Sequence, residues 1–396
     1  MKQAKILLQC QLKHDKRKLN FFLSAMLYLF FTSQAQAQNT FNFDGQLSGV
    51  VNWSPENDAY GFLNGRYIPE LNYDWKLDSI HSLYFEASAN MYGSVFAYKG
   101  DSLISEGNIQ PYRIYARFTG NRYEARVGLQ KIDFGSAMIL RPLQWFNEID
   151  PRDPLQLTNG VYAALGRYYF LNNANIWVWG LIGNVNTRGF DAVKPNPEIP
   201  EFGGRFQYPV PKGELALSYH HRYADVSEFP QFATLDAIPE NRIGLDGKWD
   251  VGVGLWFESA YIKKQQNVGE LTNQTLFTLG SDYTFGIGSG LNVVFEHMVL
   301  GYDESNIGFA THYNTSAVSI SYPIGFFDHL SFFTTYSWEF RAASYFLNYQ
   351  HDFRKITGYF MAYFTPKTSS SFVYNSNDFV NSFTGPGLRV MLVFNH

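Results

Sequence analysis

Residues 41–53 read Phe41-Asn42-Phe43-Asp44-Gly45-Gln46-Leu47-Ser48-Gly49-Val50-Val51-Asn52-Trp53. Every odd-numbered position holds an apolar residue or glycine, and nearly every even-numbered position holds a polar residue. A β-strand sends successive side chains to opposite faces, so this period of two predicts a strand with one apolar face and one wet face.

The same alternation recurs along the rest of the chain. It is clear at 63–77 and 83–95, and it predicts further strands near 112–118, 123–129, 160–170, 175–183, 201–209, 213–223, 241–249, 251–262, 273–285, 291–301, 310–322, 329–341, 343–351, 355–365 and 386–396. These make about 18 strands, each near the 9–11 residues that cross a membrane with tilt. We therefore predict an all-β fold, a transmembrane antiparallel up-and-down β-barrel.

The connections between these strands alternate in length. Short ones fall at 78–81, 119–122, 171–174, 210–213, 248–251, 286–290, 324–328 and 352–354. Long ones fall at 54–61, 98–108, 133–159, 184–200, 224–240, 263–272, 302–309 and 366–384. Barrels with periplasmic turns and outer loops have this pattern. The alternation fails around Arg341-Ala342, where the sequence could form either two strands or one bent strand. A barrel of about 16 strands is therefore the nearest alternative to 18.

Composition narrows the class of protein. Of 396 residues, 45% are apolar, 18% are aromatic and 17% are charged, against about 25% charged in average globular domains. Beyond the N-terminus no run approaches the ~20 apolar residues of a membrane helix. Helical membrane proteins and disordered chains are excluded. A soluble propeller is also excluded, because its repeat of ~40–50 residues is absent.

The first 37 residues have the pattern of a secretory signal peptide. A basic region from Lys2 to Lys18 precedes an apolar run at 19–31, and Ala35-Gln36-Ala37 offers a small-x-small cleavage site. We predict that residues 1–37 are cleaved and that residues 38–396 form a single barrel domain in the outer membrane.

Cleavage changes the charge and the cysteine count. Residues 38–396 hold 25 basic and 34 acidic residues, a net charge of −9, which argues against nucleic acid as a partner. The one cysteine, Cys10, leaves with the signal peptide. The mature chain is therefore predicted to have neither a disulfide nor a thiolate metal site.

The 133–159 loop is too apolar for a segment exposed to water. Loops longer than about 12–15 residues are usually functional or disordered, and the rings and aliphatic side chains here argue against disorder. Its large apolar residues are Met138, Ile139, Leu140, Leu143, Trp145 and Phe146. We predict that the loop folds into the barrel and packs on its wall.

Charged residues in and beside this loop form the candidate pore constriction. The loop would bring five of them into the lumen: Arg141, Glu148, Asp150, Arg152 and Asp153. Neighbouring strands are predicted to point Arg113, Arg117, Arg122 and Arg126 inward, with Glu86 and Glu124 among them, although Arg122 sits at a turn. An acidic loop facing these arginines would set up a transverse field that orders polar solutes. In the alternative interpretation, the arginines are ordinary solvated wall residues paired with nearby carboxylates.

Catalysis and cofactor binding are not predicted. His220-His221 places one ring on each face of a strand, and neither a G-x-S-x-G nor an H-E-x-x-H motif occurs. A plugged receptor would need more than ~100 residues ahead of the barrel and ~22 strands. Here the first strand begins within four residues of the predicted cleavage site.

The last strand carries a family resemblance. It reads Gly387-Leu388-Arg389-Val390-Met391-Leu392-Val393-Phe394-Asn395-His396 and resembles the C-terminal strand by which outer-membrane barrels are recognised for insertion, except that two residues follow Phe394. Together with the signal peptide and the loop alternation, it makes the mature chain similar to gram-negative porin-like barrels, which include 18-stranded substrate-specific channels and polysaccharide exporters. The residues at 128–135 and 150–154 also resemble a strand and loop of uncharacterised porin-like barrels.

The resemblance implies a porin-like channel for passive diffusion of small polar or charged solutes. Two alternatives stay open: a barrel for export or assembly of a surface polysaccharide, and a structural barrel without transport. The implied partners are outer-membrane lipids, small polar solutes and the barrel-assembly machinery. Whether the protein forms a homo-oligomer is left open.

Overall fold

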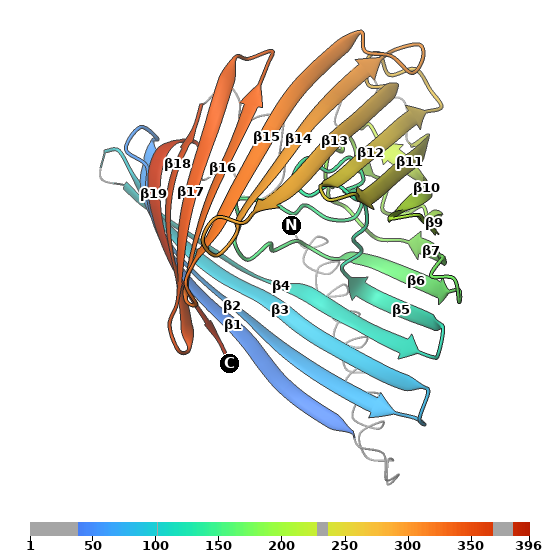
Figure 1. Cartoon of the computed structure of the whole chain (residues 1–396), viewed down its shortest axis with the longest axis horizontal. Helices are drawn as coiled ribbons and strands as arrows, with labels where there is room; N and C mark the ends of the chain where they lie inside the picture. Colours follow the sequence, from blue (N-terminus) through green and yellow to red (C-terminus); the bar gives the residue numbers. More distant parts are fainter. Residues whose placement is uncertain (1–38, 101, 228–236, 367–382) are drawn as a thin grey trace, which may run out of the picture.

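The computed structural model describes residues 39–100, 102–227, 237–366 and 383–396. These residues form one sheet of 18 long strands and one two-residue strand (Figure 1). The first strands are β1 (Thr40–Trp53), β2 (Ala59–Lys76), β3 (Ser82–Tyr98), β4 (Ser102–Thr119), β5 (Tyr123–Gln130), β6 (Val161–Tyr169), β7 (Asn175–Leu181), β8 (Lys194–Pro195) and β9 (Glu201–Val210). The others are β10 (Gly213–Asp225), β11 (Ile238–Asp250), β12 (Gly254–Lys264), β13 (Asn273–Phe285), β14 (Leu291–Asp303), β15 (Thr311–Ile324), β16 (Asp328–Ser337), β17 (Ala342–Asp352), β18 (Ile356–Thr365) and β19 (Gly385–Asn395).

The sheet closes on itself as an antiparallel barrel. Each long strand pairs with its neighbours in chain order, and β1 pairs with β19 as well as with β2. In this seam Gln46 lies opposite Asn395, and Trp53 lies opposite Leu388. Closure leaves no strand edge at the seam for the lipid to meet. The predicted all-β barrel of about 18 strands is confirmed.

The count of 16 strands is wrong. Residues 338–341 make a tight turn between β16 and β17, which pair with each other along their whole length. Arg341 adopts a left-handed backbone conformation there, with φ of 50°. The chain reverses at this point rather than bending, so two strands form where one was the alternative.

The alternation of the sequence becomes the two faces of the barrel wall. On β1, Leu47 and Val51 are 50% and 56% exposed, whereas Ser48 and Val50 are 4% and 2% exposed. On β1, odd-numbered side chains therefore point outward and even-numbered ones inward. The outward apolar belt and the closed sheet are those of an outer-membrane barrel. In the described residues no helix is long and apolar enough to cross a membrane.

The height of the wall is uneven. Strands β2, β3 and β4 have 18, 17 and 18 residues, whereas β5 and β7 have 8 and 7. The predicted long loop at 98–108 is wrong, because β4 already begins at Ser102 and pairs with β3 up to Tyr98. The polar and glycine-containing sequence of this segment is compatible with a strand once β3 supplies the hydrogen bonds.

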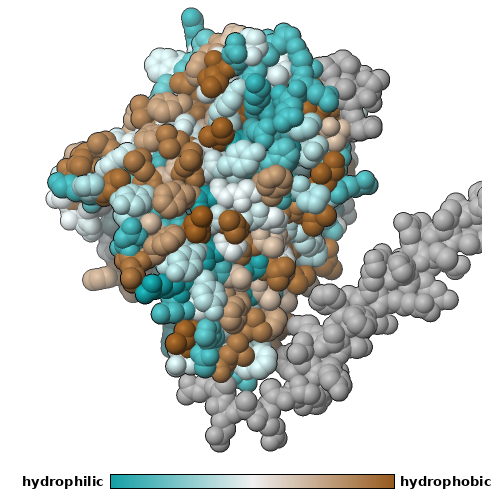
Figure 2. Space-filling view, turned by 90° about the vertical axis from the view of Figure 1, so that its right-hand side faces the viewer, coloured by the Kyte–Doolittle hydropathy of each residue, from teal (hydrophilic) through white to brown (hydrophobic). Residues whose placement is uncertain are grey.

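The arrowheads of β2, β4 and β6 point to the right in Figure 1. Figure 2 looks at the molecule from that side and shows hydrophilic and hydrophobic residues interspersed over it. The predicted signal peptide at 1–37 lies outside the described residues, as do parts of the predicted loops at 224–240 and 366–384.

Candidate functional site

Residues 131–160, here called the inserted loop, connect β5 to β6 inside the barrel (Figure 1). Leu140, Leu143 and Phe146 are each at most 1% exposed. Gly244 on β11 makes room for the loop, because a Cβ at this position would lie 2.3 Å from Cδ2 of Leu143. Burying these side chains against the wall removes their apolar surface from water and stabilises the inserted position. The loop packs on the wall, as the sequence predicts.

Two glutamates of the opposite wall hold the backbone of the inserted loop. Glu258 on β12 accepts hydrogen bonds from the amides of Ala137 at 2.9 Å and Leu143 at 2.6 Å. Glu296 on β14 accepts from the three consecutive amides of residues 138–140, at 2.5–3.0 Å. A buried carboxylate needs such donors in place of water, and irregular backbone needs acceptors for its amides. Each group therefore satisfies the other.

A third wall carboxylate contacts the start of the loop. Asp246 on β11 accepts a hydrogen bond from Ser136 Oγ at 2.9 Å and is paired with Arg205 at 2.6 Å. Sequence reasoning missed Asp246, Glu258 and Glu296. The available signal was that each stands on the inward face of its strand. That signal does not distinguish a carboxylate in open water from one that contacts the loop.

The predicted charged residues of the loop bond mainly within the loop. Asp150 pairs with Arg152 at 2.8 Å, and Arg141 pairs with Asp133. Asp153 accepts from two backbone amides of the turn that follows it, each at 3.0 Å. These contacts stiffen the loop, and Asp153 also interacts electrostatically with Arg66 on β2.

Glu148 is half-buried, and its backbone amide donates to Oγ1 of Thr158 at 2.8 Å. Burial raises the pKa of Asp153 above its ordinary value, and the two backbone amides only partly oppose this. Burial alone would lower the pKa of Arg141, but the neighbouring carboxylate of Asp133 raises it above the ordinary arginine value. The loop environment thus favours the neutral form of Asp153 and the charged form of Arg141.

Four of the predicted wall residues, Arg113, Arg117, Glu124 and Arg126, lie on the inward face of β4 and β5. The prediction is wrong for Arg122, which is exposed in the turn between these two strands. Arg113 is buried and donates to the backbone oxygen of Thr158 at 2.8 Å, so it contacts the inserted loop directly. Arg117 lies over the ring of Tyr84, 4.5 Å from its centroid. Arg126 pairs with Glu124 at 2.7 Å. Of these four charged residues, only Arg113 bonds to the loop among the described residues.

Two further inward arginines extend this group, and sequence reasoning missed both. Arg66 on β2 lies 5.9 Å from the centroid of Tyr92, and Arg167 on β6 lies 3.7 Å from that of Trp177. We call the five together the arginine wall: Arg66, Arg113, Arg117, Arg126 and Arg167. Aromatic faces attract cations and hold them in place without neutralising their charge. Glu124 is the carboxylate within this wall, and it pairs with Arg126 at 2.7 Å and with Arg167 at 3.5 Å.

A second loop, residues 182–200, also turns into the barrel. Its Asp191 pairs with Arg222 at 2.8 Å and with Arg242 at 2.7 Å, and all three side chains are at most 2% exposed. Glu240 completes the cluster by pairing with Arg222 at 2.5 Å. Removing one partner from such a buried group leaves an uncompensated charge, so these pairs fix where the loop lies. Within the described part of the chain no three His, Cys, Asp or Glu side chains gather to hold a metal ion.

Comparison with known proteins gives similarity in structure alone. No protein-family model matches the chain, and no curated protein sequence matches it. Among solved structures, OccD3 (OpdP) of Pseudomonas aeruginosa is similar with a TM-score of 0.59 and 10% identity, over 92% of this chain and 94% of that one. This chain has the fold of a porin-type outer-membrane barrel.

Two other solved structures are similar to this porin-type barrel. OccAB1 of Acinetobacter baumannii has a TM-score of 0.54 and 8% identity, over 92% of this chain and 99% of that one. Wzi of Escherichia coli has a TM-score of 0.50 and 10% identity, over 89% and 84%. Wzi is described as an outer membrane protein involved in group 1 capsule assembly and as a carbohydrate-binding β-barrel. At these identities the likeness establishes the fold.

Proposed function

We propose that the protein is an outer-membrane channel for passive diffusion of small polar or charged solutes, with no catalytic step. The observation that supports this most is the inserted loop, which is fastened across the lumen to Glu258 and Glu296 and contacts Arg113 on the other side. A loop that narrows a polar lumen beside fixed charges is a selectivity device. The proposed constriction residues are Arg113, Arg117, Glu124, Arg126, Arg141, Glu148, Asp150, Arg152 and Asp153.

The charge of the constriction can be tested in planar bilayers. Arg117 and Arg126 lie on the inward face of the wall, so their charges act on ions that pass through the lumen. The double variant Arg117→Gln/Arg126→Gln should shift the reversal potential toward cation preference. Lys99→Gln removes a positive charge from the exposed tip between β3 and β4 and is the matched control.

The dependence of the reversal-potential shift on salt concentration distinguishes charges in the constriction from the charge of Lys99 at the exposed tip. A charge at the tip acts over a Debye length of about 8 Å at physiological salt and about 3 Å at 1 M, whereas buried charges are screened less. The effect of the double variant should therefore survive at 1 M salt and that of the control should fade. Absence of any conductance, or equal shifts in both variants, would contradict the channel.

A carbohydrate-handling barrel is the second candidate. Its support is the row of rings and cations on one face of the lumen, where Tyr84, Tyr115 and Trp177 carry Arg117, Arg126 and Arg167 at 4.5, 6.0 and 3.7 Å. Aromatic faces and guanidinium groups together suit sugar rings with acidic substituents. Saturable binding of an acidic oligosaccharide without ion conductance would favour this candidate over the channel.

A further inference from the structure

A small pocket lies where the inserted loop meets the second loop, at the ends of β6 and β7. It encloses about 100 Å³ of space. Residues 146–148 and 159–160 of the inserted loop form part of its lining, and residues 183–188 of the second loop and the start of β6 form the rest. The polar residues that line it are Asn147, Glu148, Asn159, Asn184, Asn186 and Arg188. Of these, only Glu148 belongs to the proposed constriction.

Two buried residues of this pocket have polar atoms whose bonding capacity is unused. Arg188 is 5% exposed, and its Nη2 donates to Glu201 at 2.8 Å. Nε and Nη1 of the same guanidinium have no hydrogen-bond partner among the described residues. Asn147 is 2% exposed; its Nδ2 donates to the backbone oxygen of Ile132 at 3.2 Å, whereas its Oδ1 accepts no hydrogen bond from the described part of the chain. Buried polar groups of this kind are costly unless they are satisfied, so they point to a ligand that supplies both an acceptor and a donor.

The lining of the pocket is held in place by contacts on its far side. Arg188 lies 5.7 Å from the centroid of Phe146, and its partner Glu201 is also bonded to the ring of His220 at 3.0 Å. Asn184 accepts from the backbone amide of Tyr162 at 3.0 Å and donates to the backbone oxygen of the same residue at 3.2 Å. A site whose side chains are already ordered loses little conformational entropy when it binds a ligand.

The charges around the pocket favour an uncharged ligand. The positive charge of Arg188 is already balanced by Glu201, with which it pairs at 2.8 Å. A metal cation would lie against the N–H groups of this guanidinium, and an anion would lie beside Glu148, which lines the same pocket. A hydroxyl group both accepts and donates hydrogen bonds. It can therefore accept from Arg188 and donate to Oδ1 of Asn147, so the lining suits a neutral ligand rich in hydroxyl groups.

We propose that this pocket binds one uncharged hexose unit of a glycan at the outer surface. A space of about 100 Å³ equals the volume of roughly three water molecules, so it takes the hydroxyl-bearing edge of a single sugar ring. Asn159 and Asn186 are exposed beside the pocket and offer amides to the rest of the ring, and Tyr162 presents an exposed aromatic ring. The long loops of such barrels lie on the outer side of the membrane. The site is separate from the rings and cations of the lumen and does not depend on channel activity.

Saturation-transfer NMR on the purified protein tests the site. The protein is kept in lauryldimethylamine oxide, a detergent that contains no sugar, and the probes are D-glucose, D-galactose and D-mannose. At least one of the three should receive saturation from the protein, and D-glucuronate, which carries a negative charge, should receive less. Val185 is 56% exposed and lines the pocket, so Val185→Trp should fill the opening and reduce the signal at least tenfold.

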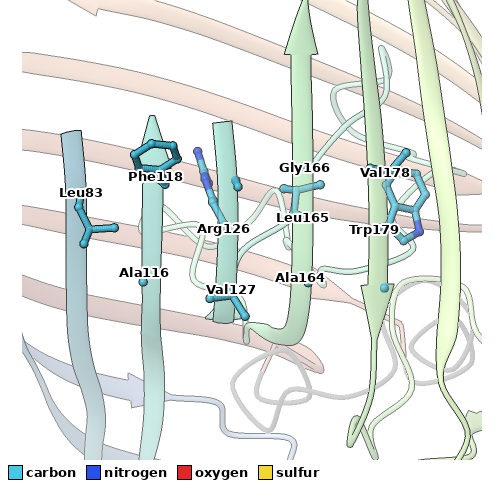
Figure 3. Close-up of a pocket in the computed structure, with 12 residues that line it drawn as sticks. Leu83, Ala116, Phe118, Arg126, Val127, Ala164, Leu165, Gly166, Val178 and Trp179 are labelled. Carbon is cyan, nitrogen blue, oxygen red and sulfur yellow. The ribbon is translucent and has the colours of Figure 1, made fainter. Parts of the chain in front are cut away.

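The matched control is Val178→Trp. Val178 is 57% exposed and lies on β7, where it lines a different hollow on the wall of the barrel (Figure 3). This variant should bind the sugar as wild type does. A second test variant, Arg188→Lys, keeps a cation beside Glu201 but removes the guanidinium donors, and it should also weaken binding at least tenfold. Resistance of the barrel to trypsin shows that each variant is folded.

Three results would overturn the sugar site. They are no saturation of any of the three hexoses, equal signals from the two valine variants, and stronger binding of D-glucuronate than of D-glucose. Repeating the experiment in phospholipid vesicles with and without lipopolysaccharide identifies the source of the sugar. Loss of the hexose signal with lipopolysaccharide would assign the pocket to a lipid-linked sugar, and an unchanged signal would assign it to a glycan that is not lipid-linked. Both of these results support the site.

Discussion

At the scale of single residues, Glu296 accepts hydrogen bonds from three backbone amides of the inserted loop. Its carboxylate accepts from the amides of residues 138–140 and also from Nε1 of Trp256 at 2.9 Å. Hydrogen bonds to a charged acceptor contribute more than neutral ones, and unsatisfied buried amides are costly. One wall side chain thus decides whether three consecutive peptide groups of the loop are satisfied.

Glu296→Gln should loosen the inserted loop without opening the barrel. The neutral amide keeps one weaker acceptor and turns two donors toward backbone amides, at a cost of about 1.5–3 kcal/mol. We expect trypsin to cleave after Arg152 in the variant, because the bond after Arg141 precedes Pro142 and resists trypsin, and single-channel current to become larger and noisier. Glu106→Gln, an exposed change on β4, is the control. Equal trypsin resistance in both variants would show that Glu296 does not hold the loop.

At the scale of elements, the inserted loop combines apolar packing with two kinds of charged contact. One is a carboxylate bonded to backbone amides, and the other is an arginine paired with a carboxylate. Asp153 is 6% exposed and accepts two amides of the turn that begins at Leu155. The other charged anchors, Arg141 and Arg152, are paired with carboxylates of the same loop. Burial is the largest influence on the pKa of Asp153, and it favours the neutral form of this carboxyl.

The stability of the loop should depend on pH through Asp153. Because burial raises the pKa of this carboxyl, the folded state binds its proton more tightly than the unfolded chain does. The resulting stabilisation is complete below the ordinary value of 3.8 and is lost as pH rises through the raised pKa. Asp153→Asn stays neutral, so the Tm of wild type relative to this variant should fall as pH rises above 3.8. Parallel Tm curves for the two proteins would refute this.

The strands were predictable from the sequence because burial on one face and water or lipid on the other act on every second residue. The inserted position of the loop was predictable because six large apolar residues between Met138 and Phe146 cannot remain in water. Its anchors were not predictable. Glu258 and Glu296 lie more than 100 positions along the sequence from the amides they bind. The alternation of apolar and polar residues in their strands predicts only that these two side chains point inward. The length of β4 was missed because its outer half faces no apolar core.

At the scale of the whole molecule, neighbouring residues on each strand of the barrel wall face the lipid and the lumen in turn. Leu47→Arg places a cation on the outward face and should cost roughly 2–4 kcal/mol near the bilayer midplane. Asn42→Arg, on the inward face of the same strand and exposed, should cost much less. Urea unfolding from lipid vesicles measures both. Equal losses would mean that the assignment of faces is wrong.

The membrane-embedded protein is expected to begin at Gln38. The small residues Ala35 and Ala37 suit the cleavage site of signal peptides, and β1 begins at Thr40, two residues after the expected new terminus. Intact-mass analysis of the protein from outer membranes should find a chain of residues 38–396. A mass that includes the basic residues between Lys2 and Lys18 would contradict processing.

The pairing of β1 with β19 determines which strand pair forms last when the barrel folds. Every other long-strand pair joins neighbours along the chain, whereas Gln46 and Asn395 are 349 positions apart. Hairpins can form one after another as strands become available, but the first strand must wait with an open edge until the last has arrived. Contacts between such distant positions form slowly. A chain that stops before Gly385 would keep two open edges permanently, so the final eleven-residue strand is what turns a long curved sheet into a closed wall.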